Sequence, residues 1–121
     1  AAHALTQNLE NMAYHPYTYA VMGAMADKDI VGVIKPLLNT IDFWYFCDLP
    51  TPRAAKATDL QIILLDLGFE PGPDRGCQLF DSPELAYQEA LKKAGENDRI
   101  TVFGSFYTVA GVMSYRNSKS N

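Results

Sequence analysis

The sequence predicts an α/β fold of the Rossmann-like kind, a three-layer αβα sandwich with a mostly parallel sheet. The first observation is that short runs of β-branched and aromatic residues alternate with helix-like stretches along the chain. The second is that several of these stretches carry capping residues at their ends. The third is composition, because 121 residues with 48% hydrophobic and 20% charged side chains suit one domain with a core. Residues 1–121 are therefore predicted to form a single domain.

The two ends of the chain give separate expectations. Residues 1–12 look like a helix, because Leu5, Leu9 and Met12 share one face. No capping residue precedes this helix, and the abrupt start indicates a fragment that is truncated at its N-terminus. At the other end, we expect residues 116–121 to form a disordered tail.

The first half of the chain predicts two strands. Residues 17–25 (YTYAVMGAM) are apolar and aromatic enough for a central strand. Asp29 is placed to cap a short helical segment. Pro36 should break that segment or start a new turn. Residues 41–47 (IDFWYFC) predict the next strand, and a loop containing Pro and Thr follows it.

The next predicted helix begins at Thr58, which has capping-box spacing with Gln61, and ends at Gly68. A turn-rich loop leads to a short strand at residues 78–80. Ser82 then caps a further helix, with Pro83 in its first turn and Gly95 after its end.

The stretch VFGSFYTVA joins a buried strand over residues 100–103 directly to a last helix. Ser105 occupies the N-cap position, and Gly104 permits a sharp turn or a close backbone approach. A helix that starts at a strand end leaves backbone N–H groups that suit a carboxylate or a phosphate. The alternative is an ordinary junction in which Ser105 only caps the helix. The apolar stripe of this helix is predicted from Phe106, Val109, Ala110 and Met113.

A second polar cluster, Asp27-Lys28-Asp29, follows the first strand. It is either a solvated turn with Asp29 as a cap, or a lysine held between carboxylates to meet an anionic group. Arg53 is either a surface arginine or a clamp for a carboxylate or phosphate. Ligands in parallel sheets bind at the carboxyl ends of the strands, where Gly104-Ser105 and the turn after the first strand are both expected.

Composition and motifs exclude several classes of function. A net charge of −4 without a Lys/Arg cluster argues against nucleic-acid binding, and no apolar run approaches the roughly 20 residues of a membrane span. No nucleotide-phosphate loop and no GxSxG motif is present, and we expect no metal site. Cys47 and Cys77 lack metal-ligand spacing and suggest two thiols of a cytoplasmic protein, although a disulfide stays open.

Three segments in order, MADKDI, DFWYFCDLPTPRAA and DRITVFGSFYTVAGVM, carry a resemblance. Over residues 1–115 the chain resembles the C-terminal domain of bacterial bifunctional dihydrofolate synthase/folylpolyglutamate synthase, in the Mur ligase superfamily. Members of that family carry an Asp-x-Ala-His-Asn-Pro motif just before the first helix. That motif is absent here, and His3 does not stand for its histidine.

The resemblance implies an ATP-dependent ligase of folate biosynthesis that adds L-glutamate to dihydropteroate or folates through an acyl phosphate. ATP and Mg²⁺ would be bound mainly by a separate N-terminal ATPase domain, so this chain alone would hold no catalytic residue, cofactor or metal and would be inactive. The full-length enzyme would be a cytoplasmic monomer. The resemblance assigns Gly104, Ser105 and Tyr107 to the glutamate side. It places Asp27 and Lys28 at the domain interface, and with Arg53 these residues are expected to make an interface or anion contact.

A rival interpretation is a stand-alone binding or regulatory module of the receiver type. Such a module should show an acidic pair after its first strand, an Asp after its third and a late Lys. The early Asp-Lys-Asp sequence matches part of that pattern, but no phosphoacceptor Asp follows in the right place.

Overall fold

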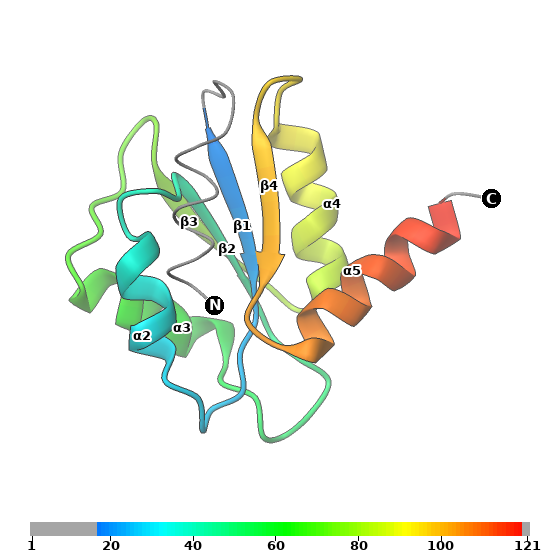
Figure 1. Ribbon diagram of the computed structural model, residues 1–121, viewed down its shortest axis with the longest axis horizontal. Helices are drawn as coiled ribbons and strands as arrows, with labels where there is room; N and C mark the ends of the chain where they lie inside the picture. The colour runs from blue at the N-terminus through cyan, green and yellow to red at the C-terminus, as the bar shows by residue number, and fades with distance from the viewer. Residues whose placement is uncertain (1–16, 120–121) are drawn as a thin grey trace.

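The computed structural model describes residues 17–119, so the helix predicted for residues 1–12 lies outside the described residues. Strands and helices alternate through this part of the chain (Figure 1). In order they are β1 (Thr18–Met22), α2 (Ile30–Ile34), the 3₁₀ helix η1 (Lys35–Leu37), β2 (Phe43–Cys47), α3 (Ala57–Asp66), β3 (Gly76–Phe80), α4 (Pro83–Lys93), β4 (Arg99–Phe103) and α5 (Phe106–Lys119). All the predicted strands are present, and β3 begins earlier than predicted.

The four described strands form one parallel sheet in the order β3-β2-β1-β4. Helices α2 and α3 cover one face, and α4 and α5 cover the other (Figure 1). This arrangement confirms the predicted three-layer α/β fold. Among residues 17–119, no helix combines the length and the apolar character that crossing a membrane requires.

The core is divided by the sheet into two clusters. Alternate side chains of β2 point to opposite faces, as the pleat of a strand requires. Trp44 and Phe46 pack with Ile34, Leu60 and Leu64 on the α2/α3 face. On the other face, the core cluster contains Tyr19, Val21, Tyr45, Cys47, Leu49, Ala86, Ala90 and Val112.

The same alternation separates the two cysteines. Cys47 lies in the cluster under α4 and α5, whereas Cys77 packs against the cluster under α2 and α3. Both thiols are free, so the disulfide that the sequence left open does not form. Burial raises the pKa of the Cys47 thiol to about 12 and that of Cys77 to about 11, which keeps both protonated and unreactive near neutral pH.

Helices begin where the sequence predicts when the capping residue lies within the same local stretch of chain. The Asp29 carboxylate accepts a hydrogen bond from the Gly32 N–H at 3.0 Å, and Ser82 Oγ accepts one from the Leu85 N–H at 3.2 Å. The predicted cap at Thr58 is wrong, because α3 already begins at Ala57. Asp48, which follows β2, accepts the Ala57 N–H at 2.7 Å and supplies a cap from nine residues away.

Helix α5 does not bury the predicted stripe. Phe106 is 81% exposed and Met113 55%, whereas Thr108 and Val112 are buried. The reason is a close helix contact, since a Cβ on Gly111 would lie 3.0 Å from Pro83 Cβ of α4. The face of α5 that carries Gly111 therefore turns inward, and the bulkier residues stay outside. The helix also continues to Lys119, where a tail was expected from residue 116.

Candidate functional site

The candidate site lies where the sheet connections change direction. Strand β1 pairs with β2 on one side and with β4 on the other. The chain leaves β1 towards α2 on one face and leaves β4 towards α5 on the opposite face (Figure 1). Ligands of open parallel sheets bind at the carboxyl ends of such a strand pair. The ends of β1 and β4 are therefore the first place to look for a ligand.

The backbones after these two strands are in very close contact. Gly104 has a φ of 115°, in the region that favours glycine. A Cβ at position 104 would collide with the Gly23 carbonyl oxygen. A Cβ at position 23 would lie only 2.7 Å from Leu49 Cδ2. Gly104 is thus required by the approach of β4 to the end of β1, whereas Gly23 leaves room for Cys47 and Leu49 at the end of β2.

Two hydroxyl groups connect the start of α5 to the end of β1. Ser105 Oγ accepts a hydrogen bond from the Thr108 N–H at 3.2 Å, as its predicted cap role requires, and lies 3.0 Å from Thr108 Oγ1. Thr108 Oγ1 donates to the Gly23 carbonyl at 2.9 Å and accepts from the Gly23 N–H at 3.2 Å. Because Thr108 has a single proton, the Ser105 hydroxyl is the donor towards Thr108 in this network.

Two exposed aromatic rings belong to the first turn of α5. Tyr107 is 41% exposed, and its ring meets that of Phe106 edge-on with 6.2 Å between centroids. The first turn of α5 therefore combines backbone N–H groups with two solvent-exposed aromatic rings.

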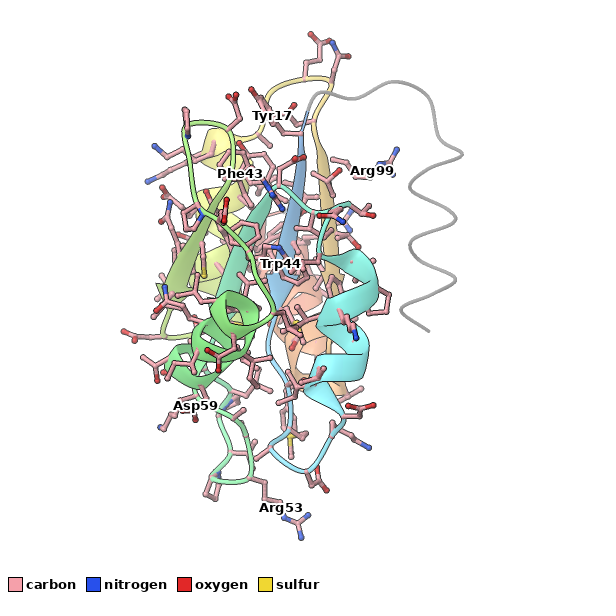
Figure 2. All side chains as sticks on the ribbon, turned by 90° about the vertical axis from the view of Figure 1, so that its left-hand side faces the viewer. Tyr17, Phe43, Trp44, Arg53, Asp59 and Arg99 are labelled. Carbon is pink, nitrogen blue, oxygen red and sulfur yellow. The ribbon has the colours of Figure 1, made fainter. Side chains whose placement is uncertain are left out.

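The loops after β1 and β2 run together beyond the edge of the sheet. The Ala26 N–H donates to the Arg53 carbonyl at 2.8 Å, and the Ala55 N–H donates to the Ala24 carbonyl at 2.9 Å. This short pairing brings Arg53 beside the segment that carries Asp27 and Lys28. All three side chains are exposed, and Figure 2 shows Arg53 at the end of the molecule opposite Tyr17.

The geometry separates the two roles that the sequence left open for Asp29. Its carboxylate accepts the Gly32 N–H, so Asp29 is a cap, in line with the solvated-turn interpretation. Asp27 and Lys28 are exposed to solvent. The structure thus places the six predicted site residues on one edge of the sheet, in two groups, around β4–α5 and around the paired loops.

Comparison with known proteins assigns the family. The Mur ligase, glutamate ligase domain family matches residues 1–106. This chain belongs to that family. The chain is 34% identical, over 96% of its length, to a dihydrofolate synthase/folylpolyglutamate synthase from Buchnera aphidicola.

Solved structures agree with this assignment. E. coli FolC in complex with DHPP and ADP matches 99% of the chain with a TM-score of 0.86 at 32% identity. A bifunctional folylpolyglutamate synthase/dihydrofolate synthase with Mn, AMPPNP and L-glutamate bound matches 96% with a TM-score of 0.81 at 31% identity. The chain spans about a quarter of the length of these proteins: 26% of the Buchnera protein, 27% of the E. coli structure and 26% of the other structure.

The sheet order also decides against the rival receiver-type module. In that doubly wound order, 2-1-3-4-5, the first and third strands are neighbours. In this glutamate ligase domain β2 separates β1 from β3, so an Asp after β3 cannot face an acidic pair after β1 as a neighbour. The described strands therefore do not have the receiver topology.

Thr108 is the residue of this glutamate ligase domain that sequence reasoning missed. It is fully buried and polar, yet it lies in a segment that reads as an apolar helix. Its only local signal is the spacing Ser105-x-x-Thr108, an N-cap followed by a hydroxyl at the third helical position. Its main partner, Gly23, is 85 residues away.

A separate depression of about 400 Å³ opens beyond the ends of β2 and β3. It is lined by Asp48, Lys56, Ala57, Thr58, Leu79, Phe80 and Asp81. Asp48 is already engaged as the cap of α3, and the depression does not include any predicted site residue. Within residues 17–119, no three His, Cys, Asp or Glu side chains come close enough together to hold a metal ion.

Proposed function

We propose that this domain is the C-terminal part of an ATP-dependent amide ligase that adds L-glutamate to dihydropteroate or to folates. The observation that carries the proposal is the match of nearly the whole chain to dihydrofolate synthase/folylpolyglutamate synthases, in both sequence and fold. The two free cysteines, one on each face of the sheet, fit a cytoplasmic enzyme.

The proposed reaction has two steps. ATP first phosphorylates the substrate carboxylate, which releases ADP and leaves an acyl phosphate. The amine of L-glutamate then attacks the carbonyl carbon, and the tetrahedral intermediate collapses to an amide and inorganic phosphate. The sequence lacks a phosphate-binding loop. We therefore assign ATP binding to the part of the full-length enzyme outside this chain.

The described residues do not fit a magnesium ion, because no cluster of three suitable ligands exists among them. We assign the ion to the same outside part, together with ATP. What this domain supplies is the binding and orientation of the incoming amino acid.

The start of α5 is proposed as the carboxylate side of the glutamate site. Helix α5 is 14 residues long, so its first N–H groups carry a useful positive partial charge. Gly104 allows the backbone to approach closely, and Tyr107 is an exposed side chain of the same helix turn. For Ser105 to donate to a carboxylate, its proton must turn away from Thr108, and Ser105 Oγ then stays held by the Thr108 N–H.

The paired loops are proposed as the surface that meets the preceding ATPase domain. Lys28 and Arg53 carry positive charge at the outer end of the sheet, where anionic groups of substrate or partner domain would approach. Asp27, which precedes Lys28 in the chain, adds a negative charge to the same loop.

The test uses the full-length enzyme that carries this domain. We measure glutamate-dependent ADP formation with dihydropteroate or a folate as acceptor. Ser105→Gly removes the hydroxyl at a cost of only a few tenths of a kcal/mol in cap stability. It should raise the glutamate KM by about ten- to a hundredfold, the value of a hydrogen bond to a charged group, and leave the ATP KM nearly unchanged. Absence of turnover in the wild type refutes the proposed activity, and wild-type glutamate kinetics in Ser105→Gly refutes the site.

A further inference from the structure

Thr108 is the one side chain that hydrogen-bonds to both halves of the β1/β4 junction in the described part of the chain. Its oxygen contacts Ser105 Oγ at 3.0 Å on α5, and both the N–H and the carbonyl of Gly23 at the end of β1. The side chain is fully buried. No substituent on Gly104 or Gly23 has room to make such a connection, since a Cβ at either position collides with a neighbour.

The hydroxyl of Thr108 makes hydrogen bonds that are not required to fill the space in the core. Valine has nearly the same shape and would fill the same space, but it cannot pair with the Gly23 backbone or with Ser105. A buried N–H and a buried carbonyl left without partners are unfavourable, so this position strongly prefers a group that both donates and accepts. Only a hydroxyl of this size satisfies all three neighbours.

The Thr108 hydroxyl orients Ser105 before a ligand binds. While Thr108 donates to the Gly23 carbonyl, it accepts the Ser105 proton, so Ser105 is held both by this bond and by the Thr108 N–H. When Ser105 turns its proton to a ligand, the Thr108 N–H still holds Ser105 Oγ, and the Thr108 proton stays on the Gly23 carbonyl. A residue without a hydroxyl leaves Ser105 held only by the N–H in both states.

We propose that Thr108 is a positioning residue of the glutamate site. It orients the Ser105 hydroxyl and fixes the first turn of α5 against the end of β1, from which the segment carrying Asp27 and Lys28 departs. This inference rests on the proposed function, and it assigns Thr108 no contact with substrate. Its effect reaches glutamate through Ser105 and through the spacing of the two strand ends.

The experiment compares three variants of the full-length enzyme. Thr108→Val should raise the glutamate KM about tenfold, the scale of one well-placed hydrogen bond, and leave the ATP KM within about twofold. Thr108→Ser keeps the hydroxyl and should stay within about threefold of the wild type in glutamate KM. Val112→Ala, one turn later on the buried face of α5, lowers stability without touching the hydroxyl network and should leave both KM values unchanged.

Two results overturn the inference. One is a glutamate KM within about twofold of the wild type in Thr108→Val; the other is an equal rise in Val112→Ala, which would show a general effect of lost stability. If Thr108→Val fails to fold, Thr108→Cys replaces it. The thiol is a weak hydrogen-bond donor, so this variant should raise the glutamate KM severalfold. Ser105→Gly separates this failure from that of the proposed function. A raised glutamate KM in Ser105→Gly with none in Thr108→Val refutes the positioning role alone, whereas a wild type without glutamate-dependent turnover refutes both.

Discussion

Replacing Gly104 by Ala tests the close approach of β4 to the end of β1. The new side chain meets two penalties. A φ of 115° strains a residue with a Cβ, which costs about 1–3 kcal/mol. The Cβ also collides with the Gly23 carbonyl oxygen and lies 3.0 Å from Met22 Cγ, so the two strand ends must separate. Such overpacking costs about 1–3 kcal/mol more.

Gly68→Ala is the matched control. Gly68 has a φ of 102°, but a Cβ there would have no atom within 4 Å. It therefore meets the backbone strain without the collision. We expect Gly104→Ala to lower the free energy of unfolding by about 1–3 kcal/mol more than Gly68→Ala does.

Urea denaturation of the 121-residue chain measures both variants, with the slope of the transition as a check on two-state unfolding. Equal losses in the two variants would refute the reasoning, because they would show that backbone strain alone matters at position 104. A larger loss for Gly68→Ala would refute the assignment of the tight contact to Gly23.

Three further predictions concern the rest of the domain. Phe106→Ser should change the free energy of unfolding by no more than about 0.5 kcal/mol despite the loss of a large ring, since Phe106 is 81% exposed. Val112→Ala, on the buried face of α5, should lower it by about 1–3 kcal/mol. Comparable losses for the two variants in urea denaturation would contradict the burial of α5. Burial raises the pKa of Cys47 to about 12 and of Cys77 to about 11, so the thiols ionise first in the unfolded chain, and stability should fall as the pH rises above about 9. A Cys47→Ala/Cys77→Ala variant should lose less stability than the wild type between about pH 7 and pH 10, and an identical pH dependence would count against this. The 121-residue chain alone should show only background glutamate-dependent ATP hydrolysis, because it carries no phosphate-binding loop; turnover above a no-enzyme control would contradict the assignment of ATP to another part of the enzyme.

The sequence alone determined the features that depend on near neighbours. Asp29, Ser82 and Ser105 cap helices through backbone N–H groups three residues away, so the residue type and its spacing were sufficient. The alternation of strand and helix signals likewise determined the α/β class, because each signal is local. The quoted segments also carried the resemblance to the family, which the comparisons confirmed.

Only the tertiary structure decided which groups from distant segments meet. Asp48 caps α3 from the end of β2, nine residues before the helix begins, so this contact could not be read from α3 itself. Apolar residues occur on more than one side of α5, and the helix turns inward the side whose Gly111 allows Pro83 to approach. The pairing of Thr108 with Gly23, 85 residues apart, exists because parallel pairing brings the ends of β1 and β4 together. The energy of such contacts depends on packing across the sheet, which no local stretch of sequence contains.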